Sequence, residues 1–245
     1  MKSLNKKVNV ILLAAGSDQS RQKDGYPLCL SEIKSIPLIQ KIIIQTNNIP
    51  NNNLIVNFRE IETNKYHLDN IVKLLNPASK VVKIPGITQG AACTALLSIS
   101  EISNDDNLLI INGNEYIDID YAKTINDFSK KKLDAGVVVF KSIHPRYSYV
   151  KLDDKGYVVE ASEKKPISNF ATTGFYWFSK GKDFVDAAMG CIRKDARVND
   201  MFYICPTFNE MVLNHKKIGI RMIDEKLYHP IKSERQLENF ENSNN

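Results

Sequence analysis

The sequence lacks a long apolar run, closely spaced cysteines and a stretch of strong charge. No apolar run approaches the roughly 20 residues that a membrane-spanning helix requires. The apolar run near the start, Val8–Ala14, is rich in β-branched residues and leads into Ala15 and Gly16. We interpret it as a first β-strand and expect no membrane partner.

Cysteine is scarce, because the chain has 4 cysteines and no Cys-x-x-Cys pair. This spacing indicates neither a zinc site nor a disulfide framework, and it fits a reducing cytoplasm. Cys205 stands in an aromatic stretch, where a buried apolar thiol is a simpler interpretation than a nucleophile.

The excess of positive charge is also small: 33 Lys and Arg residues against 28 Asp and Glu residues give a formal net charge of +5. The basic residues form no stripe interleaved with aromatics, so we expect attraction for phosphates but no nucleic-acid partner. Hydrophobic residues make up 43% and charged residues 25%, which excludes a disordered chain, a collagen-like repeat and a coiled coil. We expect one domain over residues 1–245.

Strand and helix patterns alternate over the first 141 residues. Short apolar runs predict strands, and apolar residues spaced three or four apart predict helices. The expected strands are 8–14, 54–58, 81–84, 107–111 and 136–140, and the expected helices are 37–47, 66–75, 91–102 and 120–132. This alternation predicts an α/β fold with a Rossmann-like, mostly parallel sheet and helices on both faces.

After residue 141 the pattern predicts an antiparallel extension of the same sheet. Strands are expected at 147–152, 157–161 and 173–178, with a hairpin turn at 153–156. Helices at 184–192 and 208–213, a strand at 218–223 and a closing helix at 234–240 complete the pattern. The edge of this extension would allow a homodimer to pair.

Polar residues follow two of the expected parallel strands, where ligands of such sheets bind. Gly16 lets the backbone approach a ligand, and Arg21 could hold phosphate oxygens. An ordinary strand-exit loop with a solvated arginine is the alternative. After the strand at 107–111, Asn112, Asn114 and Glu115 offer amide and carboxylate oxygens.

Two further motifs could contact a ligand. Gln89 and Gly90 precede an expected helix, where Gln89 could read the edge of a base, although a tightly packed helix also begins this way. Glu163 and Lys164 could bind different parts of one ligand. The Glu163 carboxylate could accept hydrogen bonds from a polyol or amine, and the Lys164 ammonium could neutralise a phosphate. A solvated turn is the alternative.

Taken in order, these segments resemble the nucleotidyltransferase family, whose members couple a nucleoside triphosphate to a sugar phosphate or a similar phosphorylated small molecule. The matching segments are Leu12–Arg21, Tyr26–Leu30, Pro37–Ile39, Gln89–Ala92, Ile111–Glu115, Glu163–Pro166 and Thr173–Tyr176. The family fold is a Rossmann-like sheet with an antiparallel extension. The family reaction is attack of an acceptor phosphate on the α-phosphorus with release of pyrophosphate, which requires alignment and neutralisation of charge.

The resemblance divides the candidate residues between two substrates, with residues 1–141 as the nucleotide-binding half and 142–245 as the acceptor-binding extension. It implies that the nucleoside triphosphate is bound by Ala14, Ala15, Gly16, Ser17, Gln89, Gly90 and Asn112. The phosphorylated acceptor would contact Asn114, Glu115, Glu163 and Gly174, and the catalytic residues would be Arg21 and Lys164. A role in surface polysaccharide biosynthesis follows from the same resemblance.

The sequence departs from the family pattern at three places. Leu28 stands where the family has a lysine, which Lys23 or Lys34 could replace. Asn114 stands where a magnesium-binding aspartate is usual, and no second carboxylate occurs in residues 226–230. Mg²⁺ is therefore an expected cofactor with Glu115 as its only candidate ligand at the strand tip.

Two other functions remain open on the sequence. Leu28 and Asn114 would also suit a nucleotide-binding or sugar-nucleotide-binding protein that has lost catalysis. A glycosyltransferase would use Asp118 and Asp120 as a metal motif, although these residues could equally cap the next helix.

Overall fold

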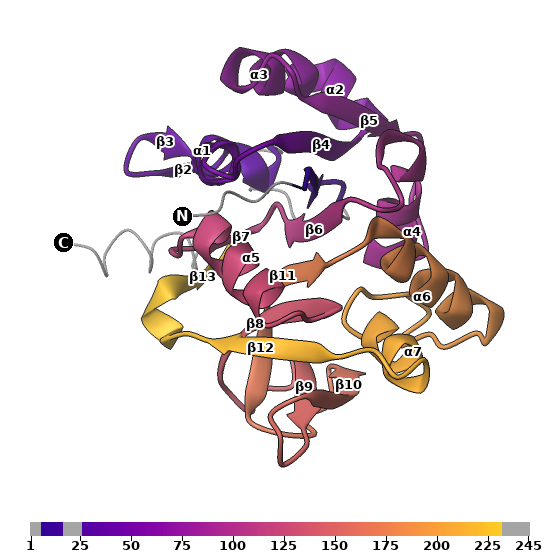
Figure 1. Ribbon diagram of the computed structural model, residues 1–245. Helices are drawn as coiled ribbons and strands as arrows, with labels where there is room; N and C mark the ends of the chain where they lie inside the picture. Colours follow the sequence, from indigo (N-terminus) through magenta and orange to yellow (C-terminus); the bar gives the residue numbers. More distant parts are fainter. Residues whose placement is uncertain (1–5, 17–25, 232–245) are drawn as a thin grey trace.

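The structure is a computed structural model that describes residues 6–16 and 26–231. Its centre is a nine-stranded sheet, shown in Figure 1. The strands of this sheet are β1 (Val8–Leu13), β4 (Asn52–Arg59), β5 (Lys80–Ile84), β6 (Asn107–Asn112), β8 (Ala135–Lys141), β9 (Ser148–Leu152), β10 (Val158–Glu163), β11 (Phe170–Phe178) and β12 (Ile218–Met222).

The sheet has a parallel centre and an antiparallel addition. The order is β10-β9-β11-β6-β1-β4-β5, and β8 pairs with both β11 and β12. Strand β1 is parallel to β4 and β6, and β4 is parallel to β5. Strand β11 is antiparallel to β6, β8 and β9. The predicted α/β class is confirmed, and β11 is the strand that joins the two parts.

Helices cover both faces of the sheet, as the pattern predicted. On one face, α1 (Leu38–Asn47), α3 (Leu68–Leu75) and α5 (Tyr121–Lys130) share a core with alternate residues of β1, such as Val10 and Leu12. On the other face, α4 (Ala91–Leu96), α6 (Gly181–Arg193) and α7 (Thr207–Leu213) share a core with Ile11. Figure 1 shows α4, α6 and α7 gathered on one side of the sheet.

Several boundaries differ from the predicted ones. The helix expected at 66–75 is α3 alone, since His67 adopts a left-handed conformation with φ of 52° and separates α3 from α2 (Glu60–Tyr66). The helix expected at 91–102 ends at Leu96 and is followed by the 3₁₀ turn η3 (Ile99–Glu101). The closing helix expected at 234–240 lies outside the described residues.

Short elements complete the described chain. Strands β2 (Glu32–Ile33) and β3 (Ile36–Pro37) pair with each other, and β7 (Glu115–Ile117) pairs with β13 (Tyr228–Pro230). Two further 3₁₀ turns are η2 (Leu28–Leu30) and η4 (Glu225–Leu227). Within the described ranges, we find no helix with the length and apolarity to cross a membrane.

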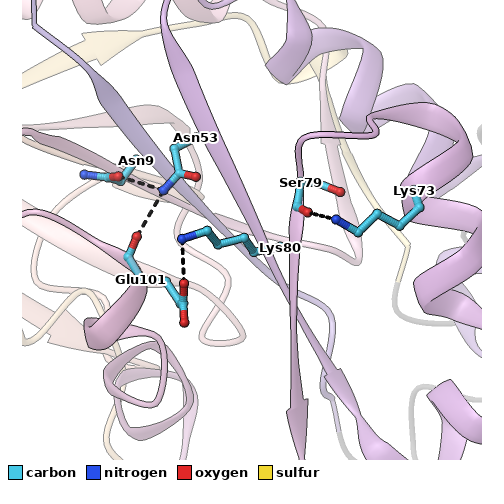
Figure 2. A network of polar contacts seen from close by, with 6 residues as sticks. All are labelled: Asn9, Asn53, Lys73, Ser79, Lys80 and Glu101. Atoms are coloured by element: carbon cyan, nitrogen blue, oxygen red, sulfur yellow. Dashed lines mark hydrogen bonds and ion pairs between the residues drawn. The ribbon is translucent and has the colours of Figure 1, made fainter.

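A polar network ties the segment after α4 to the sheet (Figure 2). The Asn53 Nδ2 atom donates to the Asn9 side chain at 3.0 Å and to the Glu101 carbonyl at 3.1 Å. The Glu101 carboxylate accepts from the Lys80 ammonium at 2.7 Å. Asn9 is buried, so these bonds satisfy polar groups that would otherwise be costly to bury, and they fix the start of β1 against β4.

The Gly136→Ala substitution tests the packing between the sheet and α5. A methyl group at Gly136 would lie 2.5 Å from a ring atom of Phe128, which stacks on Trp177 with centroids 5.8 Å apart. We expect a loss of about 1–3 kcal/mol in the free energy of unfolding, measured by urea denaturation, because overpacking displaces the ring.

The matched control is Gly86→Ala, since nothing lies within 4 Å of the added methyl group there. This control should change the free energy of unfolding by less than about 0.5 kcal/mol. Equal effects of the two substitutions would contradict the packing argument.

Candidate functional site

A cavity of about 360 Å³ lies beyond the carboxyl ends of β1 and β6. Its wall includes residues from segments that are far apart in the sequence, namely 13–16, 27–29, 88–91, 112–115, 146–148 and 201–205, together with Glu163, Gly174 and Tyr228. The parallel strands β1 and β6 both end at this edge of the sheet. The sequence pattern predicts a ligand there.

Close backbone packing holds the two strand ends together. The amide of Gly113 donates to the Leu13 carbonyl at 2.7 Å, and the amide of Ala14 donates to the Asn57 carbonyl at 2.9 Å. A methyl group at Gly113 would lie 2.8 Å from the Ala14 Cβ atom, so only glycine allows this approach.

Most of the residues predicted from the sequence line this one cavity. They are Ala14, Ala15, Gly16, Gly90, Asn112, Asn114, Glu115, Glu163 and Gly174. Gln89 is exposed and does not belong to the described lining, although its carbonyl accepts from the Phe202 amide at 2.7 Å. Ser17 and Arg21 lie outside the described residues, as does Lys23.

Glu115 is the centre of a buried hydrogen-bond network on the inner wall. Its Oε1 atom accepts from the Tyr228 hydroxyl at 3.0 Å, and its Oε2 atom accepts from Asn112 Nδ2 at 3.0 Å. Burial, and then the Glu115 charge, raise the pKa of Tyr228, so this hydroxyl keeps its proton at neutral pH. The network therefore has a permanent donor on one side.

Gly174 provides the space for this network. Its backbone is left-handed, with φ of 75°, and a methyl group there would lie 2.1 Å from Glu115 Oε2 and 2.5 Å from Asn112 Nδ2. Glycine is thus required at this position both for the conformation and for the contact.

The described donors at the strand tip do not fit a protein-held magnesium ion. Both Glu115 oxygens accept hydrogen bonds, Asn114 supplies a neutral amide, and the neighbouring strand β13 carries Tyr228, His229 and Pro230. Within the described ranges, no group of three or more His, Cys, Asp or Glu residues could hold a metal ion. A hard divalent cation prefers several oxygen ligands, including carboxylates.

The cavity wall also carries a second buried carboxylate, Glu163, and the cation Arg146. The Glu163 carboxylate accepts a hydrogen bond from the Ser148 hydroxyl. The Arg146 guanidinium donates to the Tyr147 hydroxyl and lies 4.7 Å from the centre of its ring. Lys164 is not part of the described lining. Its ammonium donates to the hydroxyl of Tyr203, and Tyr203 does line the cavity.

Sequence reasoning missed Arg146 and Tyr228 as wall residues. Arg146 follows a His-Pro pair in the loop between β8 and β9, and only its basic character could have drawn attention to it. Tyr228 reaches the cavity because β13 pairs with β7, a contact between residues 113 positions apart for which the sequence carries no local signal.

The structure decides between the alternative roles of Asp120 and Cys205. Asp120 caps α5, because its Oδ1 atom accepts from the Lys123 amide at 2.8 Å. Cys205 is a buried thiol whose pKa is raised first by burial and then by the Glu163 charge, so it stays protonated at neutral pH. Both findings agree with the structural interpretations of these residues.

The Tyr228→Phe substitution removes one donor to Glu115 while keeping the ring. We expect a loss of about 1.5–3 kcal/mol in the free energy of unfolding, because a hydrogen bond to a charged group is lost in a buried site. Urea denaturation measures the loss. Tyr121→Phe is the control, since Tyr121 is also buried and packs edge-on against Phe175, and its hydroxyl has no hydrogen bond among the described residues. A loss no larger than that of the control would contradict the network.

His229 gives the described chain a distinct acid sensitivity. Burial lowers the pKa of His229 from 6.5 to about 4, and its ring stacks on Tyr116. The unfolded chain therefore binds the proton more readily, so stability is present above pH 6.5 and is lost as the pH falls towards 4.

Replacing His229 with Asn removes this titration. Between pH 7 and pH 4.5 the wild-type protein should lose about 1 kcal/mol more in the free energy of unfolding than the variant does, since solvent screens the half-buried ring. Urea denaturation at the two pH values measures this difference. Parallel losses in the two proteins would show that His229 is not held neutral by burial.

Comparison with known proteins adds a family to this geometry. A search of curated proteins finds no match. Among solved structures, a nucleoside-diphosphate-sugar pyrophosphorylase from Vibrio cholerae RC9 is 18% identical with a TM-score of 0.79, covering 96% of this chain and 99% of that one. A UDP-glucose pyrophosphorylase complexed with UDP-glucose is 15% identical with a TM-score of 0.74, covering 97% and 98%.

These structural similarities establish the fold. The family model for nucleotidyl transferases matches residues 26–221, which is most of the sequence and includes the greater part of the cavity wall. The chain therefore belongs to the nucleotidyl transferase family.

Proposed function

We propose that this protein couples a nucleoside triphosphate to a sugar phosphate or a similar phosphorylated small molecule and releases pyrophosphate. The observation that carries the proposal is the single cavity shared by the Ala14–Gly16 loop, Gly90, the strand tip at 112–115 and Glu163. The family membership supports the same reaction type. The structural neighbours act on nucleotide sugars according to their names.

The proposal assigns the nucleotide to one end of the cavity and the acceptor to the other. The Ala14–Gly16 loop, Gln89, Gly90 and Asn112 would contact the nucleoside triphosphate, and Ser17 and Arg21 belong to the same proposed set. The acceptor would contact Asn114, Glu115, Glu163 and Gly174, with Lys164 near its phosphate. We also propose one domain, because one sheet takes strands from both halves of the chain.

The chain's own residues would act by binding and alignment. Two guanidinium groups line the cavity, Arg59 at the end of β4 and Arg146 in the loop before β9. Their charges favour phosphates, and the rigid wall between them would hold the attacking and leaving groups in line. Because the described strand-tip donors do not fit a magnesium ion held by the protein, magnesium stays part of the proposal as an ion that would be bound through the nucleotide phosphates. A homodimer, a cytoplasmic location and a role in surface polysaccharide synthesis also stay part of the proposal.

A second candidate function is a nucleotide-binding protein that has lost catalysis. The specific observation in its favour is that Leu28 lines the cavity where the family pattern has a lysine, while both Glu115 oxygens accept hydrogen bonds. Such a protein would bind nucleotide and release no pyrophosphate.

A ligand panel separates these functions. Thermal unfolding is measured with ATP, GTP, CTP, UTP and dTTP, each with magnesium or with a chelator, and pyrophosphate release is then measured with sugar phosphates. A transferase should be stabilised by one nucleotide, because a ligand of the native state raises the apparent stability by mass action. It should also release pyrophosphate only when an acceptor is present.

A matched pair of variants links the result to the cavity. Glu163→Gln should weaken acceptor binding about tenfold or more, since a charge-assisted hydrogen bond is lost. Glu160→Gln, an exposed position on the same strand, should leave it unchanged. Nucleotide binding without pyrophosphate release would favour the second candidate, and no binding of any nucleotide would contradict both.

A further inference from the structure

The Lys164 side chain is held at its tip as well as at its backbone. Its amide donates to the Tyr147 carbonyl at 3.0 Å, and its backbone is left-handed with φ of 54°. Its Nζ atom donates to the Tyr203 hydroxyl at 2.9 Å and lies 5.1 Å from the centre of the Tyr203 ring. A lysine with an exposed side chain normally samples many rotamers, so this contact selects one place for the ammonium.

Tyr203 is itself fixed by its neighbours in the chain. Phe202 and Ile204 are both buried. The Phe202 amide donates to the Gln89 carbonyl at 2.7 Å, and its carbonyl accepts from the Ala92 amide at 3.0 Å. The segment Met201–Cys205 is therefore held to the turn that starts α4, and the backbone of Tyr203 is fixed on both sides.

The backbone of the segment packs closely against this turn. A methyl group at Gly90 would lie 2.4 Å from the Phe202 carbonyl oxygen, and Gly90 has a φ of 111°. Tyr203 lines the cavity, so its bond to the Lys164 ammonium places this cation beside a residue of the cavity wall.

We propose that Tyr203 is a positioning residue that holds the Lys164 ammonium where it binds the phosphate of a phosphate monoester acceptor. An ammonium has three N–H donors, so the bond to Tyr203 leaves two for phosphate oxygens. Placing the cation before the ligand arrives removes part of the ordering cost of binding. The inference rests on the proposed function, since that function supplies the phosphorylated acceptor.

The test compares Tyr203→Phe with Tyr157→Phe. The first substitution removes only the hydroxyl and keeps the ring beneath the ammonium. The second makes the same chemical change next to β10, in the hairpin, outside the described cavity wall. Binding of inorganic phosphate, glucose 1-phosphate and the stabilising nucleotide to the full chain is measured by calorimetry at fixed ionic strength.

We expect Tyr203→Phe to raise the dissociation constants of both phosphate probes about five- to tenfold. The dissociation constant of the nucleotide and the melting temperature should stay near the wild-type values, as should all values for Tyr157→Phe. In a Lys164→Ala background, the loss of the Tyr203 hydroxyl should have no further effect, because no ammonium remains to be positioned.

The possible contrary results are distinguishable. Unchanged phosphate binding in Tyr203→Phe, or equal losses with and without Lys164, would overturn the positioning role and leave the proposed function intact. If the wild-type chain binds nucleotide but neither phosphate probe, this inference is overturned, because the phosphate that Lys164 is proposed to bind does not bind. A wild-type chain that binds none of the three would contradict the proposed function itself.

Discussion

The close packing of Gly113 against Leu13 and Ala14 is the contact on which the cavity depends. The Gly113 amide and the Leu13 carbonyl lie 2.7 Å apart, so the ends of β6 and β1 meet without an intervening side chain. A larger residue would separate the loop at 14–16 from the strand tip at 112–115. Parallel pairing alone aligns the strands, and the glycine then brings their exits within reach of one ligand.

The inner wall depends on a different kind of contact, between residues that are distant in the sequence. Strand β11 crosses the sheet between β6 and β8 and places Gly174 beneath Glu115 and Asn112. Strand β13 pairs with β7 and brings the Tyr228 hydroxyl to the same carboxylate. The buried carboxylate is therefore accommodated because the antiparallel addition supplies its space and the separate β7–β13 pair supplies its second donor.

The parts of the structure that the sequence predicts are those governed by local patterns. The apolar run at Val8–Ala14 and the small residues after Gly90 have a periodicity or composition that indicates β1 and α4. The position of β11, the break at His67 and the contact of Tyr228 with Glu115 depend on pairing across the fold, for which no local signal exists. Arg146 belongs to the same class, because its loop gains its place only from the strands around it.

The charges around the cavity set what the site can do chemically. Arg59 at the end of β4 and Arg146 in the loop before β9 line the wall, and Lys164, which follows β10, contacts the wall residue Tyr203. The carboxylates of Glu62, Glu115 and Glu163 line the same wall, so the cavity carries charges of both signs. Cations at separate positions around the wall favour an anionic ligand that reaches between them, because charges already in place need little reorganisation when the ligand binds. A ligand with two separated phosphates meets this arrangement better than one with a single phosphate, which agrees with the proposed joining of two phosphorylated substrates.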